Sequence, residues 1–197
     1  MTQTNTPDTQ SFTLSKMHKR THTKPRILAF AREAGGAAVI APIVKSMRAR
    51  KWRVLLFSKD YGTNIFLKKG LTSIPLQKFS SEGIMQKFGK KLPDCIVTSC
   101  ASLPELDMTE RYLWKWGKKN NVPAVAILDQ WQNYASRFSG PKGTKRLGYI
   151  PDAIFVMDAL AQKDMVAEGF CCTKIKVTGQ PALDLVRHEH RHAQKLK

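Results

Sequence analysis

Residues 26–58 read RILAFAREAGGAAVIAPIVKSMRARKWRVLLFS. A short apolar run at 27–31 precedes two glycines, then apolar residues three and four apart between Val39 and Met47, then a second apolar run at 53–58. Apolar side chains at that spacing lie on one face of a helix, whereas uninterrupted apolar runs of this length are typical of strands buried on both faces. The stretch therefore predicts a strand, a helix and a second strand.

The same alternation continues along the sequence. Further apolar runs predict strands at 94–99, 122–129, 152–158 and 174–179, with a shorter one at 73–76. Helices are expected near 61–69, 81–90, 107–120 and 159–168, and the polar, glycine-rich residues 136–149 are expected to form a loop. Strands that alternate with helices form a parallel sheet covered on both faces. The sequence thus predicts a single α/β domain with a doubly wound, mostly parallel, Rossmann-like sheet.

Two basic segments flank the predicted domain, which covers residues 26–186. Residues 1–25 are poor in large apolar side chains and are expected to be a disordered lead-in, and residues 187–197 are expected to be a basic tail or the start of a crossover. The chain has 33 Lys and Arg against 15 Asp and Glu, a net charge of +18, and most of the excess falls within 26–186. Such a surface attracts phosphorylated substrates, anionic membranes or nucleic acid.

Several classes of protein do not fit the composition. No apolar run approaches the roughly 20 residues of a membrane-spanning helix, and four cysteines among 197 residues are too few for a disulfide scaffold. The cysteine and histidine spacings match no zinc site, so no metal is expected. The sequence contains no zinc-finger, helix-turn-helix or RNA-recognition pattern, so nucleic acid is not an expected partner. A signal-peptide core is also missing, and a cytoplasmic location is expected.

Ligands of open α/β sheets bind beyond the carboxyl ends of the strands, so the loops after the predicted strands are the candidate sites. After the first strand come Glu33, Gly35 and Gly36, before a helix expected to begin near Ala37. Glycines let the backbone approach a ligand, and a helix start favours an anion. A tight structural turn is an equal alternative. After the fourth apolar run, Ser99 lies in a cluster of hydroxyl residues that suits a sugar or phosphate, or that simply caps the backbone.

The most varied group of side chains follows the run at 122–129. It reads Asp129-Gln130-Trp131-Gln132-Asn133-Tyr134, with Arg137-Phe138 shortly after. Aromatic faces and amides suit a sugar ring, and arginine suits a phosphate or carboxylate. Asp129 is the candidate general base, and Gln130, Trp131, Tyr134 and Arg137 are candidate ligand-binding residues. In the alternative interpretation, the aromatic residues belong to the core beneath a long loop.

A last candidate segment follows the final apolar run. Thr178, Gly179 and Gln180 precede Pro181, and a glycine followed closely by a proline gives a sharp exit from a strand. The hydroxyl and the amide are placed to reach a ligand at the sheet edge. A purely structural turn is as compatible with this sequence.

These segments, taken in order, resemble a known family. The stretch 26–58 resembles the opening of GT-B-type glycosyltransferases and of the related UDP-N-acetylglucosamine 2-epimerases, where a strand, a glycine-containing turn and a helix with a proline lead into the second strand. The segment 129–138 is similar to one in uncharacterised polysaccharide-biosynthesis members of the group. DAIFVMDALAQKDMVAEGF and KIKVTGQPALD, at 152–170 and 174–184, resemble the end of their N-terminal domain.

The resemblance implies a cleft enzyme with two Rossmann-like domains. The N-terminal domain would bind a sugar or lipid-linked acceptor, and the second would hold the nucleotide-sugar donor, with no metal and no tightly bound cofactor. Gly35 and Gly36 would face the cleft, residues 129–137 would line its acceptor side, and residues 178–181 would lie at the hinge. Basic patches of such domains commonly dock on anionic membranes, which implies a peripheral position on the inner face of the membrane.

Two departures from the family pattern shape the expected function. The sequence ends shortly after the expected hinge, so a split or truncated enzyme, inactive without a second-half polypeptide, is expected. An epimerase would carry an acid in the loop after the fourth apolar run, where residues 98–102 read TSCAS. The preferred hypothesis is therefore the acceptor-binding half of a glycosyltransferase. The alternatives are an epimerase-like protein and a non-catalytic basic module that binds a phosphorylated glycan, a membrane or nucleic acid.

Overall fold

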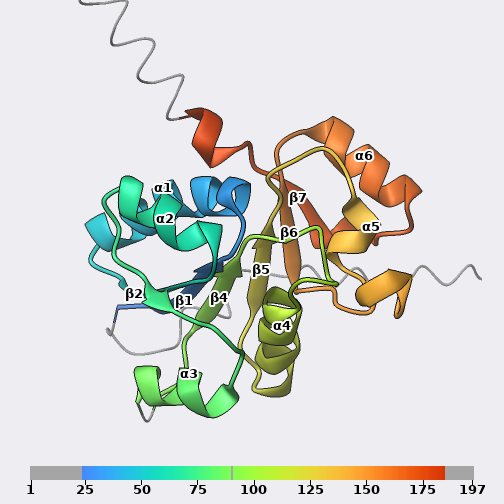
Figure 1. Cartoon of the computed structure of the whole chain (residues 1–197). Helices are drawn as coiled ribbons and strands as arrows, with labels where there is room; N and C mark the ends of the chain where they lie inside the picture. The colour runs from blue at the N-terminus through green and yellow to red at the C-terminus, as the bar shows by residue number, and fades with distance from the viewer. Residues whose placement is uncertain (1–23, 90, 185–197) are drawn as a thin grey trace, which may run out of the picture.

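The computed structural model describes residues 24–89 and 91–184 (Figure 1). The predicted lead-in, apart from its last two residues, and the predicted basic tail lie outside the described residues, as do residue 90 of the third predicted helix and residues 185–186 of the predicted domain. The described chain forms one seven-stranded sheet in the order β3-β2-β1-β4-β5-β6-β7, and every neighbouring pair of strands is parallel. The predicted α/β class and the parallel sheet are confirmed.

The strands and helices follow the predicted alternation closely. The strands are β1 Arg26–Ala31, β2 Arg53–Ser58, β3 Ile74–Pro75, β4 Cys95–Thr98, β5 Ala124–Ile127, β6 Ala153–Val156 and β7 Ile175–Val177. The helices are α1 Ala34–Ala49, α2 Tyr61–Lys68, α3 Ser81–Phe88, α4 Thr109–Lys119, α5 Tyr134–Arg137 and α6 Ala159–Ala167, with short 3₁₀ turns at Pro141–Gly143 and Cys172–Lys174.

Several boundaries differ from the prediction, most of them by one or two residues, and three of the differences bear on the candidate site. Helix α1 begins at Ala34 rather than near Ala37, so both glycines lie in its first turn. The segment 136–149, predicted to be a loop, contains the end of α5 and one 3₁₀ turn. Strand β5 is shorter than the apolar run 122–129 that predicted it. At the start of the run, the Val122 N–H donates to the Gly117 carbonyl at the end of α4 (2.9 Å), and at its other end the run extends two residues beyond the strand.

The direction of winding reverses between β1 and β4. Strands β2 and β3 lie on one side of β1, and β4 to β7 follow on its other side. Helices α1 and α2 therefore cover one face of the sheet, and α3, α4 and α6 cover the other, as the two core clusters show. In open parallel sheets such a reversal leaves a crevice at the carboxyl ends of the two strands, where ligands bind.

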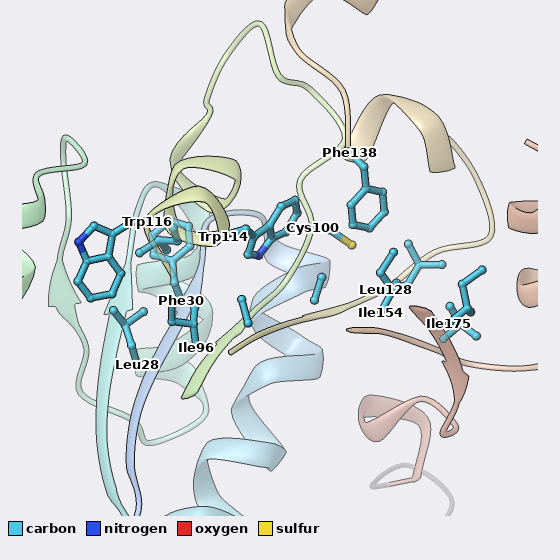
Figure 2. Close-up of a cluster of buried hydrophobic side chains, with 14 of the residues drawn as sticks. Leu28, Phe30, Ile96, Cys100, Trp114, Trp116, Leu128, Phe138, Ile154 and Ile175 are labelled. Carbon is cyan, nitrogen blue, oxygen red and sulfur yellow. The ribbon is translucent and has the colours of Figure 1, made fainter. Parts of the chain in front are cut away.

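The alternation of side chains along β1 supplies both cores. Ile27 and Ala29 pack toward α1 and α2, whereas Leu28 and Phe30 pack toward α4. Figure 2 shows the cluster that contains Leu28 and Phe30. In this cluster the Trp114 ring stacks on the Phe138 ring, with ring centroids 5.3 Å apart. These side chains are almost completely buried, which removes a large apolar area from water. The packing fixes α4 and the segment after β5 against the sheet, so the loops at the carboxyl edge rest on a rigid base.

Candidate functional site at the carboxyl ends of the strands

The start of α1 packs directly against the loops that follow β4 and β5. A Cβ atom added at Gly36 would lie 2.5 Å from the Ser99 side chain, and one added at Gly35 would lie 2.4 Å from Oδ2 of Asp129. Real Cβ atoms do not approach that closely, so only glycine permits this contact at either position. The structure thus brings Gly35, Gly36, Ser99 and Asp129 together at the topological reversal of the sheet.

Asp129 is the central acidic group of this arrangement. Its side chain is only 6% exposed, and Oδ1 accepts a hydrogen bond from Nη1 of Arg137 at 2.9 Å. Its other oxygen, Oδ2, lies toward Gly35 and accepts no side-chain hydrogen bond from the described residues. Burial raises the pKa of Asp129 and the Arg137 guanidinium opposes that rise. One carboxylate oxygen is therefore held in place while the other remains available.

Arg137 itself does not face the crevice. Its side chain is 1% exposed, and besides Asp129 it donates to the carbonyl of Cys100 and, through Nε, to the carbonyl of Gln132 at 3.0 Å. The sequence assigns Arg137 to a ligand anion, whereas the structure uses its donors within the protein. A buried guanidinium needs such acceptors, because an unpaired one would be costly. Arg137 is thus a positioning residue for Asp129.

The other predicted residues divide between the edge and the core. The Tyr134 ring is buried in the core, as the alternative interpretation expected, and so is the Phe138 ring. Trp131 is 45% exposed, and its Nε1 donates to Asp158 after β6 at 2.7 Å. Gln130 is exposed at the same edge. The core aromatics anchor the segment, and Trp131 and Gln130 are the members that can contact a ligand.

The segment after β7 reaches the same cluster. Nε2 of Gln180 donates to the backbone carbonyl of Asp129 at 3.3 Å. Gly179 has a φ of +87°, a left-handed conformation that favours glycine, and it turns the chain just beyond Thr178, which is exposed. Of the predicted residues in this segment, Gln180 has a direct contact with the Asp129 loop.

An ion-pair cluster borders the site on the side of β2. Arg32, next to Glu33 at the end of β1, binds Asp60 with its Nε 2.6 Å from Oδ2. It also lies 4.0 Å from Asp107, which pairs with Lys59 at 3.2 Å. Glu33 is partly exposed, with its carboxylate 3.8 Å from Nη1 of Arg32. These contacts fix the loops after β1 and β2 to the loop that precedes α4.

Sequence reasoning missed two buried charges in the first turn of α4. Glu110 is 2% exposed and accepts hydrogen bonds from the Ser99 hydroxyl and the Ala101 N–H. Arg111 is fully buried and donates to backbone carbonyls of Ala101, Asp107, Ser136 and Ser139. A signal was present: Glu110 lies three and four residues before Leu113 and Trp114, on the apolar face of the helix.

Solved structures of this fold include three that were determined with UDP-GlcNAc or UDP. UDP-N-acetylglucosamine 2-epimerase from Neisseria meningitidis bound to UDP-GlcNAc matches with a TM-score of 0.59 and 12% identity, over 86% of this chain and 50% of its own. The S. aureus MnaA–UDP structure matches with a TM-score of 0.60 and 17% identity, over 83% of this chain and 46% of its own. The Methanocaldococcus jannaschii UDP-GlcNAc 2-epimerase in complex with UDP-GlcNAc and UDP matches with a TM-score of 0.57 and 15% identity, over 79% of this chain and 46% of its own.

The described domain has the fold of one Rossmann-like half of a GT-B-like protein. The chain spans about half the length of the structures that it matches, and at 12–17% identity the likeness shows the fold alone. No protein-family model matches the chain, and no curated protein matches its sequence. Among residues 24–89 and 91–184, no helix is both long and apolar enough to cross a membrane.

The buried Glu110 gives a testable pH dependence. Burial raises its pKa to about 7, from 4.5 for an unperturbed glutamate, against the opposing hydrogen bonds of Ala101 and Ser99. The unfolded chain therefore releases this proton at lower pH than the folded chain. As a result, the free energy of unfolding decreases as the pH rises from about 4.5 to about 7. This one group should account for a decrease of about 3 kcal/mol in the free energy of unfolding across that pH range.

The Glu110→Gln variant should lose that contribution. The amide can accept from the Ala101 N–H and donate to the Ser99 hydroxyl, so both bonds are retained without a charge. Urea unfolding at pH 5 and pH 8 should show a smaller loss of stability on raising the pH than in the wild type. Glu82→Gln, which removes an exposed carboxylate on α3, serves as the control. An unchanged pH dependence in Glu110→Gln would contradict the buried titration.

Proposed function

We propose that the chain is the acceptor-binding half of a two-domain, nucleotide-sugar-dependent glycosyltransferase of polysaccharide or glycolipid biosynthesis. The observation that carries the proposal is the placement of Asp129. It lies at the topological reversal, nearly buried, with Oδ1 fixed by Arg137 and Oδ2 turned toward the glycine turn of α1. A carboxylate held in this way, with burial raising its pKa, is suited to accept a proton from an attacking hydroxyl.

The groups around Asp129 supply the other requirements of a sugar site. The first turn of α1 begins beside Asp129, and the N–H groups at a helix start favour an anion, while Gly35 and Gly36 make room for the Asp129 and Ser99 side chains. Gln130 and Trp131 are exposed beside it and offer an amide and an aromatic face. The nucleotide-sugar would lie on a second Rossmann-like domain, either in the same polypeptide or in a partner, with Gln180 near the connection.

The reaction assigned to this site is transfer of a glycosyl group to an acceptor hydroxyl. Asp129 would take the hydroxyl proton as the oxygen attacks the anomeric carbon, and the nucleoside diphosphate would leave with the bonding electron pair. Arg137 would keep Asp129 ionised and oriented through the bond to Oδ1. The net positive charge of the chain supports an anionic setting for the acceptor, such as a membrane surface.

The test uses the enzyme with its second domain present, carried by the same polypeptide or by a partner. It follows UDP release from UDP-sugars, with and without a glycan acceptor. Asp129→Asn is expected to lower turnover by roughly 10²–10⁴-fold, the usual contribution of a general base. Asp164→Asn on α6 removes the same charge away from the crevice and should leave turnover unchanged. Undiminished turnover in Asp129→Asn would remove the assignment.

Epimerisation is the second candidate, and one observation favours it. The matching solved structures include UDP-N-acetylglucosamine 2-epimerases. Glu110 brings a carboxyl group to the loop at 98–102, but it does not replace the acid expected there. Both carboxylate oxygens of Glu110 are occupied by Ser99 and Ala101, so it holds the loop rather than facing the crevice. UDP-N-acetylglucosamine turnover in the absence of any acceptor would favour epimerisation over transfer.

A further inference from the structure

A second concave site lies beside the carboxyl edge, between α4 and the segment that joins β3 to α3. The cavity has a volume of about 440 Å³, within the range of small-molecule sites. Four lysines line it: Lys59 after β2, Lys78 before α3, and Lys115 and Lys119 on α4. Figure 1 shows α3 and α4 on the same face of the sheet. We call this cavity the lysine pocket.

The positive charge of the lysine pocket is largely unbalanced. Asp107 is the one acidic residue among its described lining residues, and it pairs with Lys59 at 3.2 Å. Within the described part of the chain, no carboxylate lies within ion-pair distance of Lys78, Lys115 or Lys119. Like charges converging on one concave surface repel one another, and a bound anion would relieve that repulsion.

Helix α4 ends at Lys119, and a cation in the last turn of a helix interacts favourably with the helix dipole. Lys115 and Lys119 are four residues apart, and like charges at this spacing destabilise a helix slightly. Tyr112 lies three residues before Lys115 on the same face and is 43% exposed, although it is large and partly apolar. The helix therefore presents two ammonium groups and an aromatic ring to the pocket.

An aromatic wall lies beside the lysines. The ring centroids of Phe79 and Tyr112 are 5.8 Å apart and the rings are tilted by 46°; both residues line the pocket, and so does Trp116. Aromatic faces stack on the apolar face of a sugar ring, and lysine ammonium groups bind phosphate oxygens. The two features occur together within a volume that holds a monosaccharide with one or two phosphates.

We propose that the lysine pocket binds a small phosphorylated sugar, with the phosphate on Lys78, Lys115 and Lys119 and the sugar ring on Tyr112 and Phe79. The pocket lies next to the loop that follows β1, because Asp107 in its wall lies 4.0 Å from Arg32. The binding itself does not depend on the proposed transfer reaction, and it can be measured without turnover.

The experiment titrates the full chain with N-acetylglucosamine 1-phosphate by calorimetry, at an ionic strength of about 0.15 M to screen the general charge of the surface. Inorganic phosphate and N-acetylglucosamine are titrated separately, and each should bind more weakly than the combined molecule. The double variant Lys78→Ala/Lys115→Ala should weaken binding at least about tenfold, equivalent to about 1.4 kcal/mol. Tyr112→Ala should remove the advantage of the sugar phosphate over inorganic phosphate.

The matched control is Lys45→Ala/Lys163→Ala, which removes the same charge from exposed positions on α1 and α6 outside the pocket. It should leave the affinity unchanged within about twofold. Equal weakening in the two double variants would show attraction by the overall charge and overturn the proposal. Failure to bind N-acetylglucosamine 1-phosphate at millimolar concentration would also overturn it, and so would binding only to phosphatidylglycerol vesicles.

Discussion

The Arg137→Met variant should lose about 3–5 kcal/mol of unfolding free energy, because it leaves a buried carboxylate without its cation. Asp129 is 6% exposed on its side chain and has Arg137 as its ion-pair partner. Methionine fills much of the space but supplies no donor to Asp129 or to the carbonyls of Cys100 and Gln132. Urea unfolding of the full chain measures the loss.

The cause of this loss can be separated from simple cavity formation. Without Arg137, the pKa of Asp129 should rise further, so the loss should be larger at pH 8 than at pH 5. The double variant Asp129→Asn/Arg137→Met removes the unpaired charge and should recover part of the stability. Arg53→Met, at an exposed position of β2, should cost no more than about 0.5 kcal/mol. A loss that neither varies with pH nor is relieved by Asp129→Asn would contradict the ion-pair explanation.

The Arg111→Met variant should be destabilised by at least about 3 kcal/mol, for a different reason. Arg111 is fully buried and donates to four backbone carbonyls, those of Ala101, Asp107, Ser136 and Ser139. Each buried carbonyl left without a donor costs about 1–3 kcal/mol, although some will recover a water. The guanidinium connects the loop after β4 to the segment after β5, so both should loosen together.

Hydrogen exchange provides the specific measurement for Arg111. Backbone amides of 99–107 and 132–146 should exchange faster in the Arg111→Met variant, while those of β1 and β2 keep their relative protection. Arg111→Lys should recover only part of the stability, because a single ammonium cannot reach four carbonyls as a planar guanidinium does. A loss below about 1 kcal/mol, or faster exchange spread evenly over the chain, would show that Arg111 does not connect the two loops.

Two buried arginines hold the candidate site in place without a ligand. Arg137 fixes a charged side chain that we assign to the reaction, and Arg111 fixes the backbone of the loops around it. Both lie under the crevice and neither faces it. A site held in this way loses little entropy when a ligand binds, which favours the ligand over a more mobile arrangement.

Much of the fold could be predicted because local patterns express it directly. The run RVLLFS coincides with β2, and the run 27–31 forms all but the first residue of β1. The predicted loop at 136–149 was partly wrong because its helical turns are short and are stabilised by distant contacts, such as the bond from the Ala135 N–H to Glu168 at 2.8 Å. Local composition contains no information about such contacts.

The candidate site was predictable only in part. The rule that ligands bind at the carboxyl ends of parallel strands led to Gly35, Ser99 and Asp129, and the structure brings them together. The same rule could not separate Arg137, which is buried behind Asp129, from Gln130, which is exposed. It also gave no reason to examine Glu110 or Arg111, because both lie on a helix rather than after a strand.

The sequence by itself determined the alternation of strands and helices, because buried strands and amphipathic helices leave different periods of apolar residues along the chain. It also determined the strong positive charge. Only the tertiary structure decided which charges meet. Arg137 is eight residues from Asp129 but 37 from Cys100, and the lysine pocket joins side chains from α4 to others that precede α3. Such contacts depend on the order of strands in the sheet, and no short stretch of sequence records that order.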